Sequence, residues 1–198
     1  MKLSTAISSS ILFASLLLTA GCNKKTETKP NYEAAINDYY QAHPACLWSQ
    51  SKKFPVQAAT SDDAKTQGYD ALTDAGLLTR TTGEKKVMIV ASKQVNNYDI
   101  SDKGRSAWTA DPAQPGYGNF CYGHRQVTSI DNVTTGADSS GNKTAQVSYH
   151  YQIGDAAAWA NTQEMKTAFP DLATALSGPK VDTASLVMTG DHWQLVKQ

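Results

Sequence analysis

The sequence has no surplus of charge of either sign, because 18 lysine and arginine residues stand against 18 aspartate and glutamate residues. A nearly neutral chain argues against binding to nucleic acid or to a large acidic partner. Charged residues make up 18% of the chain and hydrophobic residues 40%, which is typical of a folded chain rather than a disordered one. A chain of 198 residues can form one domain, or two small ones, with a buried core.

Motifs for catalysis and for cofactor binding are missing as well. The sequence contains no G-x-S-x-G nucleophile elbow, no H-E-x-x-H zinc motif, no phosphate-binding loop and no dinucleotide fingerprint. The four histidines, at positions 43, 124, 150 and 192, lie far apart in the chain. We therefore expect no cofactor, and the sequence favours a non-catalytic protein.

Apolar residues are concentrated at the start of the chain. Lys2 is followed by an apolar stretch at residues 11–18, three small residues and then Cys22. The stretch is too short to span a bilayer and is typical of a secretory signal. Residues 16–22, Leu-Leu-Leu-Thr-Ala-Gly-Cys, resemble the lipobox of bacterial lipoprotein precursors.

The resemblance implies that residues 1–21 are a signal peptide, that Cys22 is lipidated, and that residues 22–30 form a tether. Each buried CH₂ contributes about 0.8 kcal/mol, so two or three acyl chains would anchor the protein to a membrane. In Gram-negative lipoproteins an Asp after the cysteine favours the inner membrane, so Asn23 implies the outer membrane, facing the periplasm. The alternative is an ordinary signal peptide that is cleaved elsewhere.

Two further cysteines, Cys46 and Cys121, follow the predicted lipidation site. An even pair in an exported protein favours a disulfide, which would close a loop of about 75 residues. The alternative is a zinc site, since His43 precedes Cys46 and His124 follows Cys121 at ligand spacing. An oxidising compartment removes the thiolates that zinc requires, so the disulfide is favoured and no metal is expected.

Residues 31–108 are predicted to form a helical part with a small β-hairpin. Apolar residues at helical spacing predict one helix over residues 31–42. They predict a second helix that begins near Ser61 and ends at Gly76, where a left-handed residue would close it. Both helices would have one apolar face, so each must pack against another element.

After the second helix, residues 79–86 are predicted to be a turn, residues 87–91 a strand, and Asn96-Asn97 another turn. Ser101 is expected to cap a short helix. The pattern of residues 69–105 is similar to the helix, wing and exit of winged-helix domains. It begins with Tyr-Asp-Ala-Leu-Thr-Asp-Ala-Gly-Leu-Leu-Thr-Arg and ends with Tyr-Asp-Ile-Ser-Asp-Lys-Gly-Arg. The resemblance implies a shape and not DNA binding, because the helix carries acids and an exported protein does not meet chromosomal DNA.

Residues 119–198 are predicted to form an antiparallel sheet with a helix, in β-β-α-β-β order, so the fold class is α+β. A loop rich in Pro and Gly at residues 109–118 would connect the two parts. The first strand would extend over residues 120–134, and a bulge is expected where Ile130 breaks its apolar phase.

The clearest strand covers residues 144–153, where apolar and polar residues alternate. Asp155 is expected to cap a helix that crosses the sheet. Two final strands are joined by Gly190-Asp191, a two-residue hairpin signal, and Trp193 should be buried on the second of them.

Four residues are candidates for ligand binding: Tyr117, Tyr122, His124 and His150. The favoured function is a lipid-anchored lipoprotein of the bacterial envelope that binds an envelope protein or a glycan. The alternative is a small periplasmic hydrolase that uses His150 or His124. A polar cleft that holds His150 beside an acid would favour the enzyme, and a flat polar sheet face would favour the binding protein.

Overall fold

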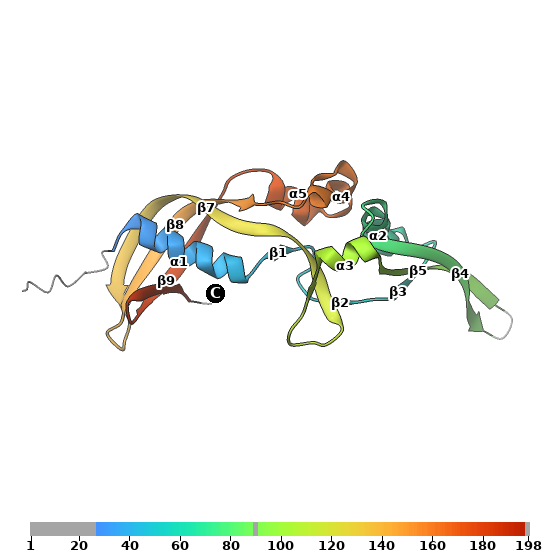
Figure 1. Cartoon of the computed structure of the whole chain (residues 1–198), viewed down its shortest axis with the longest axis horizontal. Helices are drawn as coiled ribbons and strands as arrows, with labels where there is room; N and C mark the ends of the chain where they lie inside the picture. The colour runs from blue at the N-terminus through green and yellow to red at the C-terminus, as the bar shows by residue number, and fades with distance from the viewer. Residues whose placement is uncertain (1–26, 89–90, 197–198) are drawn as a thin grey trace, which may run out of the picture.

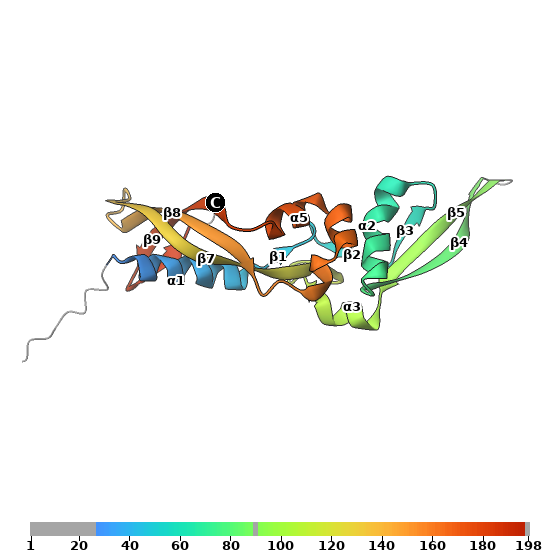
Figure 2. The same ribbon diagram turned by 90° about the horizontal axis from the view of Figure 1, so that it is seen from above.

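The computed structural model describes residues 27–88 and 91–196. The predicted signal peptide at residues 1–21 and the lipidation site at Cys22 lie outside the described residues. The described chain is a mixed α+β structure with antiparallel sheets, which confirms the expected fold class. It is elongated, with a larger sheet and helix α1 at one end and a smaller sheet and helix α2 at the other (Figures 1 and 2).

The described helices are α1 (Lys29–Ala42), α2 (Asp63–Asp74), α3 (Asp102–Ala107), α4 (Gln163–Ala168) and α5 (Pro170–Leu176), with one 3-10 turn, η1 (Ala158–Asn161). The strands are β1 (Ala45–Cys46), β2 (Lys52–Lys53), β3 (Val56–Ala59), β4 (Leu78–Met88), β5 (Ala91–Ile100), β6 (Trp108–Ala110), β7 (Tyr117–Ala137), β8 (Lys143–Gly154), β9 (Lys180–Thr189) and β10 (His192–Leu195). The larger sheet has the order β1-β7-β8-β9-β10, with β2 and β6 also paired to β7. The smaller sheet has the order β3-β5-β4.

Helix α1 packs on the larger sheet and closes the first of two hydrophobic cores. Its buried residues recur at helical spacing, and those of β8 alternate along the strand as the sequence predicts. The apolar face of the helix therefore packs directly on the apolar face of the sheet. The first core consists of Tyr32, Ala35, Ile36, Val127, Ile130, Ala145, Val147, Tyr149, Ala184, Leu186 and Trp193.

Two bulges bend β7, and side chains of α1 bond to the backbone at both. The pairing of β7 with β8 shifts register directly after Val127 and again after Ile130, so the predicted bulge is confirmed. Asn37 Oδ1 accepts a hydrogen bond from Val127 N at 2.9 Å, and Lys29 Nζ donates to the Ile130 carbonyl at 2.6 Å. These bonds satisfy backbone groups at points where the strand ladder is disrupted.

The helix that covers the sheet is α1. The prediction that a helix starting at Asp155 crosses the sheet is wrong. Asp155 has a φ of 52°, outside the helical range, and α4 begins only after Thr162, whose side chain accepts a hydrogen bond from Met165 N. Pro170 then separates α4 from α5, and each has only six or seven residues. Their buried residues, Met165 and Leu172, belong to the second core instead.

Strands β9 and β10 form the predicted terminal hairpin. Gly190 has a φ of 59°, which a two-residue turn requires. Trp193 lies opposite Met188 in the ladder, is only 8% exposed, and contacts Tyr32 of α1 with ring centroids 5.1 Å apart. The burial predicted for Trp193 is thus confirmed, and the end of the chain belongs to the first core.

Aromatic rings dominate the second core, which lies between the larger sheet and α2. Phe120 is fully buried, and its ring lies 5.0 Å from that of Trp108, 6.1 Å from Trp48 and 6.5 Å from Phe54. Most of the segments that supply this core are short. Its buried residues are Ala58, Ala71, Leu72, Leu77, Leu78, Tyr98, Phe120, Tyr122, Ala160, Met165 and Leu172.

The two cores do not follow the division of the chain into residues 31–108 and 119–198. Helix α1 comes from the first range, yet it completes the core of the larger sheet. Helices α4 and α5 come from the second range, yet they pack into the second core, where α4 lies against α2. Each core therefore combines segments that are far apart in the sequence.

The smaller sheet corrects two turn predictions. Residues 79–86 belong to β4, and Asn96 and Asn97 lie within β5, so neither place is a turn. Thr82 Oγ1 donates to Asn96 Oδ1 at 2.9 Å, and Gln57 Nε2 donates to Asn97 Oδ1 at 2.8 Å. These cross-strand bonds stabilise polar residues in a strand despite their preference for turns.

The predicted ends and caps around α2 are confirmed. Gly76 has a φ of 76°, and Leu77 N donates to the Leu72 carbonyl at 2.8 Å, which closes the helix with a left-handed residue. Ser101 Oγ accepts a hydrogen bond from Gly104 N at 2.8 Å at the start of α3. The predicted loop at residues 109–118 is shorter than expected, because β6 and the start of β7 pair across it.

Candidate functional site

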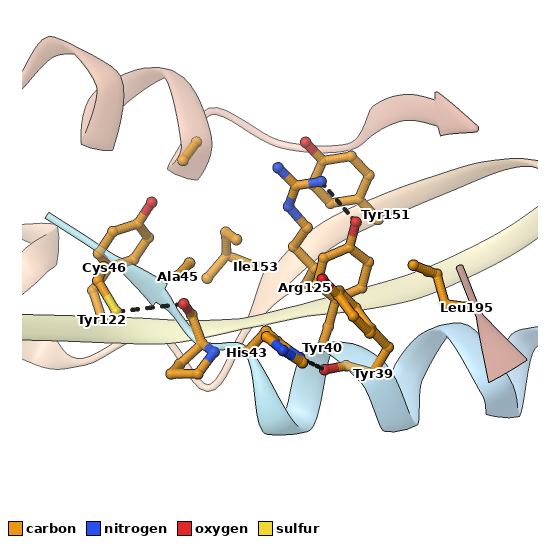
Figure 3. Close-up of a pocket in the computed structure, with 12 residues that line it drawn as sticks. Tyr39, Tyr40, His43, Ala45, Cys46, Tyr122, Arg125, Tyr151, Ile153 and Leu195 are labelled. Carbon is orange, nitrogen blue, oxygen red and sulfur yellow. Dashed lines mark hydrogen bonds between the residues drawn. The ribbon is translucent and has the colours of Figure 1, made fainter. Parts of the chain in front are cut away.

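A pocket of about 450 Å³ lies where the two cores meet (Figure 3). A volume of this size falls within the range of about 300–1,000 Å³ that is usual for small-molecule sites. The end of α1, strand β1 and the inner parts of β7 and β8 form its walls. It is lined by Tyr39, Tyr40, His43, Pro44, Ala45, Cys46, Tyr122, Arg125, Tyr151, Ile153, Ala175 and Leu195, and we call it the waist pocket.

Arg125 of β7 lies between two tyrosine rings in the waist pocket (Figure 3). Its guanidinium carbon is 5.0 Å from the ring centroid of Tyr40 and 4.7 Å from that of Tyr151. Nη1 donates to Tyr40 Oη at 3.1 Å and to Asp182 Oδ2 at 2.9 Å. Burial disfavours the charged guanidinium, but the surrounding tyrosines and Asp182 outweigh it, so the pKa of Arg125 is raised.

Two tyrosine hydroxyls near Arg125, those of Tyr149 and Tyr122, have raised pKa values. Tyr40 Oη lies 3.3 Å from Tyr149 Oη, within hydrogen-bond distance. Burial, followed by the hydrogen bond with Tyr40, raises the pKa of Tyr149 far above its ordinary value. Burial also raises the pKa of Tyr122. These groups can therefore donate and accept hydrogen bonds, but they do not act as bases near neutral pH.

Tyr39 and His43, on the last turn of α1, present two flat rings at the rim of the pocket. Their ring centroids are 4.0 Å apart with an interplanar angle of 15°, so the rings are stacked. His43 Nδ1 lies 2.7 Å from the Tyr39 carbonyl. A carbonyl only accepts, so Nδ1 carries the hydrogen, and this bond orients the imidazole.

The predicted disulfide forms part of the pocket wall. Cys46 and Cys121 are bonded, with an S–S distance of 2.03 Å, and they lie opposite each other in the pairing of β1 with β7. The zinc alternative is wrong, because both sulfurs are in the disulfide and neither is a thiolate. His43 stacks on Tyr39 instead. Among the described residues, no three His, Cys, Asp or Glu side chains are grouped so that they could hold a metal ion.

The structure places only one of the four candidate binding residues in the waist pocket. Tyr122 lines it, although it is only 7% exposed. Tyr117 lies at the start of β7, away from the pocket, with Lys53 Nζ 5.8 Å from its ring centroid. His124 lies on β7 opposite Gly154, and it does not line the pocket.

His150 lies on β8 beside an acid, but not in the waist pocket. His150 Nε2 is 3.0 Å from Asp131 Oδ2, and the two side chains are 39% and 41% exposed. The pair forms an ion pair when His150 is protonated. Neither residue lines the waist pocket or the two other cavities described for this chain. The arrangement thus places an acid beside a histidine at a position outside these three cavities.

Sequence reasoning missed the residues that give the waist pocket its character. Tyr39 and Tyr40 appeared only as part of a helix, and Arg125 and Tyr151 as positions on strands. A signal does exist, because Arg125 and Tyr151 are polar or amphipathic residues at inner positions of neighbouring strands. The two residues can be recognised as neighbours in one pocket only once the register of β7 with β8 is known.

Two other cavities differ from the waist pocket in chemistry. A groove of about 630 Å³ between α1 and β10 is larger and shares Tyr39 and His43 with the waist pocket, but no lysine or arginine lines it. A shallow depression of about 520 Å³ between α2 and α4 is lined by four carboxylates: Asp63, Asp70, Asp74 and Glu164. Neither places an arginine between aromatic rings, as the waist pocket does.

Comparisons with known proteins do not assign the chain to a family. No protein-family profile matches it, and no curated protein or solved structure is significantly similar to it. Within the described part of the chain, no helix is both long enough and apolar enough to cross a membrane. A functional proposal must therefore be based on the residues themselves.

Proposed function

We propose that the protein is a lipid-anchored lipoprotein of the bacterial envelope and that it binds its ligand, without catalysis, in the waist pocket. The observation that carries the proposal is the pocket itself, with a half-buried arginine between tyrosine rings. Large binding clefts often lie where two packed units meet, and the waist pocket lies between the two cores. The ligand would be an envelope component, either a glycan or part of a protein.

The residues that line the pocket support binding rather than catalysis. No Asp or Glu is among them. Arg125 stays protonated at any physiological pH, and Tyr122 has a raised pKa. His43 therefore has no carboxylate partner within the pocket lining, and acid–base catalysis requires a pair of groups whose protons move.

The proposed anchor rests on the resemblance of residues 16–22 to a lipobox. Cys22 would carry the acyl chains, and the tether would join it to α1 at the end of the molecule opposite the smaller sheet (Figure 1). The Cys22→Ala variant should be released from the membrane fraction or remain unprocessed. Metabolic labelling with a clickable palmitate analogue tests this, and an unlabelled wild-type protein would contradict the proposed anchor.

Photocrosslinking tests whether the waist pocket is occupied in the cell envelope. The aromatic crosslinker p-benzoylphenylalanine would replace Tyr39 in one variant and Tyr117 in the matched control. Both tyrosines are accessible aromatic residues, but only Tyr39 lines the pocket. We expect adducts at position 39 that are absent at position 117. Equal labelling at the two positions, or none at position 39, would refute the pocket as the binding site.

A hydrolase is the second candidate, and the 3.0 Å contact between His150 and Asp131 favours it. Ser129 lies directly opposite His150 in the strand ladder and would be the nucleophile. Treatment with a fluorophosphonate probe should then label the wild type and spare Ser129→Ala. Absence of label on the wild type would remove this candidate and leave the binding function.

We also propose that the likeness of residues 69–105 to winged-helix domains is a likeness of shape. It is supported by the order of α2, the β4–β5 hairpin and α3, and by the pairing of β3 with β5. Asp70 on α2 is engaged by Arg80 and Tyr98, so this helix does not present a basic surface to nucleic acid. Likewise, β7, β8, the following helices, β9 and β10 are proposed to act as one β-β-α-β-β unit that carries the pocket.

A further inference from the structure

We propose that the ligand of the waist pocket is a short, uncharged saccharide. This inference rests on the proposed function, because it names the ligand class of the same pocket. It follows from three features of the lining: the charge balance, the kind of hydrogen-bonding groups, and the placement of flat rings. A pyranose has polar hydroxyls around its edge and apolar C–H groups on its faces, and the pocket offers a partner for each.

The charge balance of the pocket favours an uncharged ligand. Arg125 is the only lysine or arginine that lines it, and its charge is compensated by Asp182 at 2.9 Å. A carboxylate or phosphate bound to the other N–H groups of Arg125 would lie close to the Asp182 carboxylate, which repels it. A cationic ligand would meet Arg125 itself. A charged ligand of either sign therefore meets a like charge beside its binding partner.

The hydrogen-bonding groups suit hydroxyls. A guanidinium carries five N–H donors in one plane, and the two bonds of Arg125 to Tyr40 and Asp182 both come from Nη1. Tyr122 and Tyr151 add hydroxyls that donate as well as accept, and burial keeps Tyr122 protonated. Sugar hydroxyls also donate and accept, so they can satisfy this mixture, whereas an apolar ligand would leave the buried groups unpaired.

The flat rings suit the face of a sugar. Tyr39 and His43 are stacked at the rim, and His43 is exposed, so the outer face of its ring is accessible. Figure 3 shows these rings on α1 beside the opening, and Arg125 and Tyr151 farther in on the sheet. A sugar ring could lie on the rim while its hydroxyls reach Arg125. The apolar faces of pyranoses stack on aromatic rings in this way.

Calorimetric titration with three probe sugars of equal length tests the inference. The probes are neutral chitotriose, anionic trigalacturonate and cationic chitosan trimer. We expect chitotriose to bind and the two charged sugars to bind at least about tenfold more weakly. If trigalacturonate binds more tightly, or if none of the three binds, the inference is wrong. The photocrosslinking at Tyr39 described above decides separately whether any ligand is held at this end of α1, where Tyr39 lines both the waist pocket and the groove beside β10.

Four variants localise the binding. His43→Ala removes the exposed ring, and Arg125→Lys keeps the charge but loses the planar fork. Each should weaken chitotriose binding by about tenfold or more. The matched controls, His150→Ala and Tyr117→Ala, remove the same residue type or a similar ring outside the pocket and should leave the affinity unchanged. Equal effects of the pocket and control variants would contradict the assignment, and circular dichroism of each variant verifies its fold.

Discussion

The two cores are built in contrasting ways. The first is formed by one amphipathic helix, α1, on the antiparallel strands β7, β8, β9 and β10, and the buried side chains of β8 alternate along the strand. The second combines a few residues from each of β3, α2, β4, β5, β7, η1, α4 and α5, which meet through a cluster of aromatic rings around Phe120. A disulfide joins β1 to β7 at the border between them.

The contrast shows that regular and irregular cores gain stability from different sources. In the first core, the side chains that alternate along the paired strands are also the ones that are buried. The local sequence pattern and the long-range packing therefore favour the same structure. In the second, few residues per segment are buried, and large rings supply most of the apolar surface. We expect the second core to depend more on the disulfide, and the following predictions are arranged from the largest effect to the smallest.

Replacing Trp193 tests how far the first core depends on its last strand. Trp193→Ala removes a buried ring that packs on Tyr32, so the free energy of unfolding should fall by about 3–5 kcal/mol. Urea unfolding of both proteins measures this. A change below about 0.5 kcal/mol, the level of ordinary surface substitutions, would mean that β10 does not contribute to the core.

Reducing the disulfide should weaken the second region more than the first. The bond closes a segment of 75 residues that contains α2 and the smaller sheet. Its loss should cost about 2–4 kcal/mol, mainly because the unfolded chain gains freedom. Hydrogen exchange should show lost protection in β3–β5 while β8 and β9 stay protected. The double variant Cys46→Ser/Cys121→Ser is the control, since a reductant should not change it; uniform loss of protection would contradict the comparison.

Asn37→Ala tests the bonds between α1 and the bulges of β7. The variant leaves Val127 N without the acceptor that Asn37 supplies, and an unsatisfied buried donor costs about 1–3 kcal/mol. Asp38→Ala, at an exposed position of the same helix, is the matched control and should change stability by less than about 0.5 kcal/mol. If the two variants unfold at the same urea concentration, the bulge contact is not important for stability.

Tyr149→Phe should have the smallest effect at neutral pH, about 1 kcal/mol for the lost hydrogen bond with Tyr40. The pKa of Tyr149 is raised in the folded state, first by burial, so its contribution is complete below the unfolded value of about 10. The contribution is lost as the pH rises above that value. Urea midpoints between pH 8 and about 11 should fall less steeply for Tyr149→Phe than for wild type, and parallel slopes would refute the linkage.

Features that depend on neighbouring residues were predictable from the sequence. The alternation in β8, the left-handed end of α2 at Gly76, the Ser101 cap and the Gly190-Asp191 hairpin each involve groups a few residues apart. The bulge near Ile130 was visible as a break in the apolar phase. The disulfide was favoured over a zinc site because two cysteines remain once Cys22 is assigned to lipidation, and because the expected compartment is oxidising.

Features that depend on distant partners were not predictable. Asn96 and Asn97 are common in turns, yet pairing with β3 and β4 holds them in a strand. Helix α1 and the segment after Asp155 both looked amphipathic, and only the packing decides which of them covers the sheet. The waist pocket arises because the register of β7 with β8 brings Arg125 and Tyr151 together beneath the end of α1. The sequence by itself determined most of the local elements, the cysteine pair and the lipobox-like start. The assembly of the pocket required contacts between distant segments, such as Tyr40 and Tyr149, which are 109 positions apart and which local patterns do not encode.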